Sequence, residues 1–178
     1  MVDLVIEKNV PVPMRDSVLL SADVFRPSPR GRYPVLLQRT PYGKGQAQIA
    51  FNILNPIRAA EAGYVVVIQD TRGRYASEGE FAPFLYESQD GFDTVEWCAA
   101  QSWSNGKVGM YGMSYVGATQ WLAAIAAPPH LVAIFPAMTA ADYHDGWIYQ
   151  GAPCRSPSAR RGRLSSLQPH SLLGSACL

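Results

Sequence analysis

The chain has 178 residues, carries 15 Lys and Arg against 14 Asp and Glu, and is 48% apolar. That apolar content is too high for a disordered protein, and its three cysteines, an odd number, cannot close a disulfide framework. A net charge of +1 provides neither a basic field for nucleic acid nor a polybasic membrane anchor. Charges interrupt the N-terminus and no apolar run is long enough to span a bilayer, so we expect a cytoplasmic protein without signal peptide or membrane span.

The average composition conceals a change near residue 153. Residues 1–153 hold 11 basic and 14 acidic side chains, whereas residues 154–178 hold four Arg, no acid and none of the 19 aromatic residues. A segment with so little to bury and no strand or helix period is expected to be a disordered tail. We favour a shifted reading frame as its origin, and a weak basic patch for nucleic acid or membrane is the alternative. The prediction is therefore a partial domain over 1–153 and a tail over 154–178.

The first segments predict an antiparallel ribbon that enters a sheet. Residues 5–10 and 18–25 have enough period-2 character to pair across a turn at Arg15 and Asp16. Residues 35–38 predict the next strand, which runs into a loop rich in turn residues.

A helix and a buried strand follow that loop. Apolar residues from Ala50 to Ile57 have helical spacing, with Pro56 breaking or restarting the helix and Gly63 closing it. Residues 64–69 are apolar throughout, which is typical of a strand in a parallel sheet with helices on both faces.

The second predicted helix begins with acidic residues, from Glu87 onward, where the helix dipole favours them. Phe92, Val95 and Ala99 are expected to form its inner face, and Cys98 to be a small core residue.

Residues 108–111 predict a strand that runs directly into a turn at 112–117 and then a helix over 118–125. Residues 131–135 predict another buried strand. Strands that alternate with helices imply right-handed βαβ crossovers, so the predicted fold class is α/β with a doubly wound, mostly parallel sheet.

The turn before the helix at 118–125 is where a nucleophile would stand. A nucleophilic serine needs its hydroxyl raised above the sheet on a tight strand-to-helix turn with small neighbours, and Gly112 and Gly117 flank Ser114 in this way. At a helix N-terminus the N–H of Tyr115 would point toward a developing oxyanion. The alternative is a turn serine that only packs against the sheet, and the strand–helix context favours the nucleophile.

Four motifs occur in order: Arg39–Lys44 (RTPYGK), Gln69–Phe81 (QDTRGRYASEGEF), Asp90–Trp97 (DGFDTVEW) and Gly109–Gly117 (GMYGMSYVG). Together they resemble the CocE/NonD family of α/β hydrolases, which is related to the X-prolyl dipeptidyl peptidases and the α-amino-acid ester hydrolases. The resemblance covers about residues 5–153 and implies the N-terminal half of an α/β-hydrolase domain, without cofactor or metal.

The resemblance gives Tyr42 a role. In this family the tyrosine of a Pro-Tyr motif offers its hydroxyl as the second oxyanion donor beside the N–H that follows the serine, and Tyr42 and Tyr115 match these positions. The alternative for Tyr42 is an aromatic packed in a turn. Asp70, Arg72 and Glu78 are expected to fix their own loop through charge-assisted hydrogen bonds, with substrate contact the less favoured alternative.

A serine nucleophile also needs an acid and a histidine, which follow it in this fold. The histidines are His130, His144 and His170, and Asp142 with His170 would satisfy the order, but His170 lies in the predicted tail. The family keeps its acid and histidine beyond residue 178, so the resemblance implies that both are absent here. A metal site of His130, His144, Asp142 and Asp145 lacks a recognised ligand spacing and is not favoured.

Two functions therefore remain open. The first is a serine hydrolase that cleaves ester, amide or X-prolyl peptide bonds of a small molecule through an acyl-enzyme, truncated here before its acid and histidine. The second is a non-catalytic remnant or interaction module. Neither nucleic acid nor a membrane is an expected partner.

Overall fold

The computed structural model describes residues 4–46, 53–140 and 142. The chain divides into two units, Met1–Ala141 and Asp142–Leu178, and the fold below is that of the first. Residues 50–52, where we predicted a helix to start, and the predicted tail over 154–178 lie outside the described residues. Among the described helices, none has the length and apolar character needed to cross a membrane.

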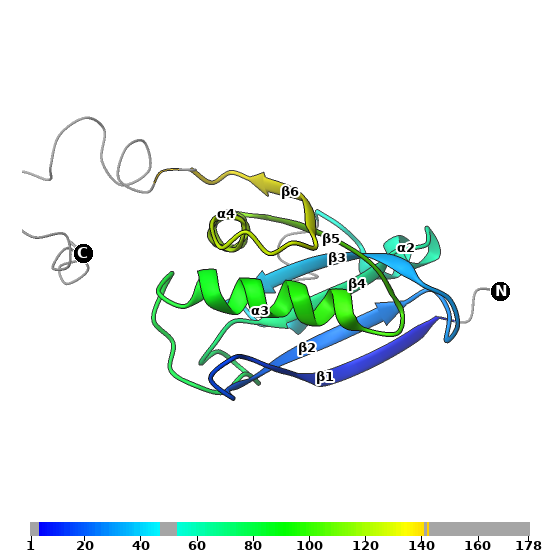
Figure 1. The fold of residues 1–178 in the computed structure, drawn as a ribbon, viewed down its shortest axis with the longest axis horizontal. Coiled ribbons are helices and arrows are strands. Elements are labelled where there is room, and N and C mark those ends of the chain that lie inside the picture. The colour runs from blue at the N-terminus through cyan, green and yellow to red at the C-terminus, as the bar shows by residue number, and fades with distance from the viewer. Residues whose placement is uncertain (1–3, 47–52, 141, 143–178) are drawn as a thin grey trace, which may run out of the picture. The chain divides into compact units, whose positions relative to one another are not determined.

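Within the described residues one sheet forms, in the order β1-β2-β4-β3-β5-β6 (Figure 1). Its strands are β1 (Val5–Pro13), β2 (Leu19–Arg26), β3 (Tyr33–Thr40), β4 (Val65–Asp70), β5 (Ser104–Met113) and β6 (Leu131–Ala137). β2 pairs antiparallel with both β1 and β4, whereas β3 is parallel to β4 and β5, and β5 is parallel to β6. The predicted antiparallel ribbon and mostly parallel sheet are thus confirmed.

The described helices are α2 (Pro56–Glu61), α3 (Glu87–Ala100) and α4 (Tyr115–Ile125). Pro56 starts α2 rather than breaking it, because Asn55 Oδ1 accepts from the backbone N–H groups of Ile57 and Arg58 and thereby caps the first turn. Gly63 follows the helix with a φ of +91°, the left-handed conformation in which helices commonly end.

Helices cover both faces of the sheet, as the residues of β4 show. Val65 and Val67 belong to the core cluster that includes residues of α3 and α4, whereas Val66 and Ile68 belong to the cluster that includes residues of α2. Successive side chains of a strand point to opposite faces, so α3 and α4 lie on one face and α2 on the other. This arrangement is the predicted doubly wound α/β sheet.

The predicted inner face of α3 is wrong only at Phe92. Val95 and Cys98 are buried, and burial raises the pKa of the Cys98 thiol. Ala99 is partly buried and packs against the same core cluster, whereas Phe92 is partly buried and is not part of it. Glu87, Asp90 and Thr94 are buried as well. Polar residues take this face because the neighbouring strands present polar side chains to it, which a hydrophobic period does not reveal.

The expectation that the last strand is buried is also wrong. Val132 and Phe135 of β6 are 61% and 63% exposed. β6 is the edge strand of the described sheet and pairs there only with β5. An apolar strand pattern predicts a strand, but only its neighbours decide whether its faces are covered.

Candidate active site

Three loops meet at one edge of the sheet, the edge formed by the carboxyl ends of its parallel strands. β3, β4 and β5 are parallel, so the loops that follow them leave from the same side. These loops carry Tyr42 after β3, Arg72 after β4 and Ser114 after β5. Thr71 N donates to Thr40 O at 3.0 Å and ties the first two loops together. This edge is therefore where the predicted site residues converge.

Ser114 has a strained backbone. Its φ of 56° and ψ of −126° lie outside the regions that side-chain-bearing residues normally occupy. Ser114 N donates to Ala137 O at 2.9 Å, so the turn is fixed to the end of β6. A strained, half-buried serine between a strand and the first turn of α4 is the arrangement that a nucleophile elbow requires.

The two glycines that flank this turn have no room for a side chain. Gly112 has a φ of +142°, and a Cβ there would overlap the side chain of Val116. A Cβ on Gly117 would lie 2.5 Å from Thr139 Cγ2 and 3.2 Å from Ala137 O. Close approach of α4 to β5 and to the end of β6 therefore depends on glycine at both positions.

Tyr115 opens α4, and N–H groups of a helix's first turn have no acceptor within the helix. Its ring stacks on Phe84 with centroids 4.4 Å apart and meets the ring of Tyr42 edge-on at 6.4 Å. Its hydroxyl accepts from Phe84 N and donates to Glu87 Oε1, each at 3.0 Å. Burial, with the charge of Glu87, raises the Tyr115 pKa. The structure thus brings the two residues that were predicted to supply the oxyanion donors, Tyr42 and Tyr115, into contact through their rings.

Asp70 and Glu78 bond to neighbouring segments of the chain. The Asp70 carboxylate accepts from Lys44 N at 2.6 Å and from Lys44 Nζ at 2.9 Å. Ser77 Oγ donates to Asp70 O at 2.7 Å, and Glu78 Oε2 accepts from Leu19 N at 3.0 Å. These bonds join the loop after β4 to the Tyr42 loop and to β2.

Arg72 sits between two carboxylates. Its Nη2 lies 2.6 Å from Asp90 Oδ1 on α3, and its Nη1 lies 2.8 Å from Asp16 Oδ2 in the turn between β1 and β2. Hydrogen bonds to these carboxylates raise the pKa of Arg72 and lower that of Asp16. The guanidinium therefore clamps the loop after β4 to a helix and to the entry ribbon.

His130 lies far from Ser114. His130 O accepts from Val108 N at 3.0 Å in the middle of β5, whereas Ser114 follows the end of that strand. At about 3.3 Å per residue, the chain from Val108 to Ser114 spans ~20 Å. His130 Nδ1 contacts Glu96 Oε2 at 2.7 Å instead. His144, Asp145 and His170 lie outside the described residues, so the described part of the chain holds no histidine that serves Ser114.

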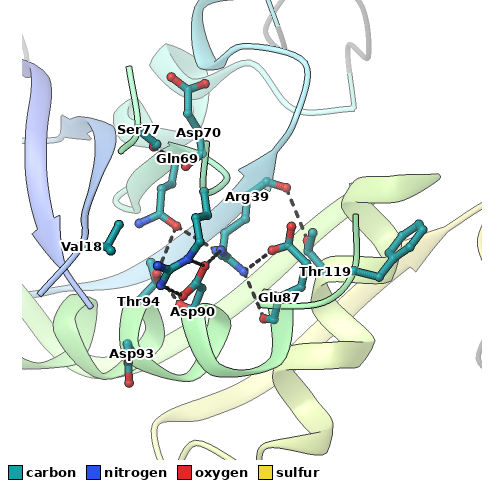
Figure 2. Close-up of polar contacts among 12 residues, drawn as sticks. Val18, Arg39, Gln69, Asp70, Ser77, Glu87, Asp90, Asp93, Thr94 and Thr119 are labelled. Carbon is teal, nitrogen blue, oxygen red and sulfur yellow. Dashed lines mark hydrogen bonds and ion pairs between the residues drawn. The ribbon is translucent and has the colours of Figure 1, made fainter. Parts of the chain in front are cut away.

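Within the part of the chain that the structure describes, no group of three or more His, Cys, Asp or Glu side chains could hold an ion. Of the residues in the disfavoured metal candidate, His144 and Asp145 lie outside that part. A buried ion pair joins Arg39 and Glu87, as Figure 2 shows, and the sequence pattern did not predict it. Arg39 belongs to the RTPYGK motif and Glu87 was seen only as a first-turn acid. The sole signal was an arginine inside an otherwise buried strand.

A strained serine at a strand-to-helix turn, on a sheet of this strand order, is the arrangement found in the α/β-hydrolase fold. The sequence profile of the family described as X-Pro dipeptidyl-peptidase (S15 family) matches residues 16–171, and the chain belongs to this family.

Curated and solved relatives agree with this assignment. The cocaine esterase of Rhodococcus sp. strain MB1 Bresler is 46% identical over 148 residues, which are 82% of this chain and 26% of that protein. A crystal structure of a CocE/NonD family hydrolase from Staphylococcus aureus is 34% identical with a TM-score of 0.68, over 74% of this chain and 27% of that one. An α-amino acid ester hydrolase is 32% identical with a TM-score of 0.64, over 75% and 25% of the two chains. The chain spans about a quarter of the length of these relatives.

Proposed function

We propose that this chain supplies the nucleophile and the oxyanion site of a serine hydrolase that cleaves ester or amide bonds. Ser114 Oγ attacks the substrate carbonyl carbon, and the electron pair of the C=O bond moves onto the oxygen. Collapse of that intermediate expels the alcohol or amine and leaves an acyl-enzyme, which water hydrolyses. The strained backbone of Ser114 is the observation that carries this proposal.

The oxyanion is held by the N–H of Tyr115 and the hydroxyl of Tyr42. Both residues lie at the edge of the sheet where Ser114 stands, with their rings in edge-to-face contact. Two donors that are fixed before the reaction stabilise charge that develops only in the transition state, so they increase kcat more than they tighten substrate binding.

Ser114 also needs a group that accepts its proton, and His130 lies beside Val108 in the middle of β5, out of its reach. As the family resemblance implies, we place the acid and the histidine in the part of the relatives that follows the matched segment. On this proposal the 178-residue chain by itself turns over esters only at the residual level that an oxyanion site gives without a base.

The proposed substrate class is supported by similar proteins, which are described as acting on an ester, on α-amino acid esters and on X-Pro peptides. We propose a small-molecule ester or amide, with an X-prolyl peptide bond among the candidates. A net charge of +1 supports neither nucleic acid nor a membrane as a partner.

A chimera tests the nucleophile. Residues 4–140 replace the matched segment of the Rhodococcus cocaine esterase, to which this chain is 46% identical. Hydrolysis of p-nitrophenyl acetate by the purified chimera is expected to fall by about 10⁶-fold in Ser114→Ala, because no other group forms the acyl-enzyme. Ser102→Ala, which alters an exposed turn serine, is the control and should keep full turnover. An active Ser114→Ala chimera would show that the nucleophile is another residue.

Covalent labelling of the 178-residue chain tests whether Ser114 has a base beside it. A fluorophosphonate probe should label Ser114 slowly at neutral pH, because a serine hydroxyl without a base is a weak nucleophile. Rapid labelling would contradict this, and loss of that labelling in His144→Ala or His170→Ala would then identify the base.

A further inference from the structure

One buried ion pair lies beneath the site. The Arg39 side chain, in β3 three residues before Tyr42, is fully buried, and its Nη1 lies 2.7 Å from Glu87 Oε2 at the start of α3 (Figure 2). Arg39 Nη1 also donates to Glu87 O at 3.2 Å, and its Nε donates to Gln69 Oε1 at 2.8 Å. The guanidinium plane is therefore fixed from two directions.

Glu87 connects Arg39 to the turn that holds Ser114, because it also contacts Tyr115. While one carboxylate oxygen faces Arg39, the other accepts from the Tyr115 hydroxyl at 3.0 Å. Phe84 N donates to the same hydroxyl at 3.0 Å, so the phenol is held on both sides. One buried carboxylate thus bridges the strand that leads to Tyr42 and the residue that follows Ser114.

A second contact joins the same two segments. Thr119, one turn after Tyr115 on α4, is fully buried, and its Oγ1 donates to Val116 O at 2.9 Å and lies 3.4 Å from Arg39 O. The side chain of Arg39 reaches Tyr115 through Glu87, and its backbone reaches α4 through Thr119. The end of β3 and the start of α4 are therefore coupled twice.

We propose that Arg39 and Glu87 are positioning residues that set the separation of the two oxyanion donors, the Tyr42 hydroxyl and the Tyr115 N–H. The inference rests on the proposed function, because it needs those two groups to be the donors. Neither Arg39 nor Glu87 contacts the substrate. Both act through the backbone and side chains of the segments that carry the donors.

The chemistry of the pair favours positioning over plain stability. Apolar residues of similar volume often fill a buried site as stably as an ion pair, because desolvation of two charges offsets much of their attraction. Glu87 Oε2 faces Arg39 as an ion pair, and Glu87 Oε1 accepts a hydrogen bond from the Tyr115 hydroxyl, a directional contact that apolar packing lacks. Displacement of a catalytic group by about 1 Å can cost on the order of 10²-fold in rate, so such contacts matter at an oxyanion site.

Acylation of Ser114 in the full 178-residue chain measures the effect. p-Nitrophenyl acetate is the acyl donor, imidazole is the external base, and mass spectrometry quantifies the acetyl group on Ser114. We expect Glu87→Ala to slow this acylation by about 10- to 100-fold. Glu87→Gln, whose amide oxygen still accepts from the Tyr115 hydroxyl, should recover part of the rate. A wild-type rate in Glu87→Ala would overturn the proposal.

Asp93→Ala is the matched control, because Asp93 lies on the same helix and forms an ion pair with Arg15 at 2.8 Å, away from Tyr115. Its acylation rate should equal that of the wild type. An equal loss in Asp93→Ala and Glu87→Ala would show a general structural effect and overturn positioning. If Glu87→Ala does not fold, Tyr115→Phe removes the same hydrogen bond and keeps the ring. An unchanged rate in Tyr115→Phe would then overturn the proposal.

A failure of the proposed function gives a different result, in which wild-type Ser114 is not acylated even with imidazole. The contact between Glu87 and the Tyr115 hydroxyl is then tested by following the ¹³Cζ NMR signal of Tyr115 as a function of pH. That signal is assigned by its loss in Tyr115→Phe. Glu87→Gln should let Tyr115 ionise at lower pH, because a neighbouring carboxylate disfavours the phenolate. An identical titration in wild type and Glu87→Gln would overturn the role of Glu87 independently of catalysis.

Discussion

Replacing Tyr42 by Phe removes a single oxygen atom from the edge of the sheet where Ser114 lies. If the hydroxyl is an oxyanion donor, its loss costs ~2.7–4 kcal/mol of transition-state stabilisation, so kcat in the chimera should fall about 10²- to 10³-fold. Tyr64→Phe is the control, because this exposed tyrosine lies just before β4, at the amino ends of the parallel strands and so away from Ser114. Equal kcat values for Tyr42→Phe and wild type would exclude the hydroxyl as a donor.

The raised pKa of Tyr115 makes the free energy of unfolding depend on pH in the alkaline range. Burial first, and the charge of Glu87 second, raise its pKa above the ordinary value of 10.0. The folded protein keeps a proton that the unfolded chain releases, so the stabilisation is complete below pH 10.0 and is lost as pH rises above it.

The free energy of urea unfolding between about pH 8 and pH 11 measures this dependence. Its decline should be shallower in Tyr115→Phe than in the wild type. A residual slope is expected from Tyr111, whose pKa burial also raises. Parallel curves for the two proteins would show that Tyr115 does not contribute.

At the scale of secondary-structure elements, Gly117 tests how closely α4 approaches the end of β6. A Cβ there would meet Thr139 and Ala137 O, so Gly117→Ala should destabilise by about 1–3 kcal/mol through overpacking. Gly109→Ala on β5 is the control, because its Cβ would meet no atom nearer than 3.7 Å. Urea unfolding compares them, and equal losses would mean that space at Gly117 is not the cause.

Asp90 tests how α3 is joined to the sheet. Its carboxylate lies 2.6 Å from Arg72 Nη2 and 3.8 Å from Arg39 Nη2, and its side chain is 2% exposed. Asp90→Ala removes a buried carboxylate that faces the guanidinium groups of both Arg72 and Arg39, so we expect the free energy of unfolding to fall by about 3–5 kcal/mol.

Glu61→Ala is the matched change at the surface, because Glu61 pairs with Arg58, whose side chain is 82% exposed. That pair should contribute no more than about 0.5 kcal/mol. Similar losses for Asp90→Ala and Glu61→Ala would contradict a special contribution from the buried cluster.

At the scale of the whole molecule, the β6 edge is where we expect association. Side chains there include Val132 and Phe135, more than 60% exposed beside an edge that no described strand pairs. Val132→Lys combined with Phe135→Lys should raise the monomer fraction in size-exclusion chromatography with little change in unfolding free energy, because exposed positions contribute little to the core. Leu85→Lys, at a 56% exposed loop position, is the control. Unchanged association in the double variant would locate the contact elsewhere.

Local sequence determined the order of strands and helices and the turn that holds Ser114. Those features depend on residues close in the chain: period-2 and helical spacing, a glycine on each side of the serine, and Asn55 with Pro56 at the start of α2. The predicted α/β sheet followed because alternating strands and helices leave few ways to connect parallel strands.

Only the tertiary structure decided which polar residues are buried and which apolar residues are exposed. Glu87 is buried because Arg39, 48 residues earlier, supplies its counter-charge, and no period along α3 carries that information. Phe135 has the pattern of a buried strand yet is exposed, because it lies at the edge of the described sheet. Pairing between distant segments therefore controls the charges behind Ser114, whereas the turn that holds Ser114 is a local property of the chain.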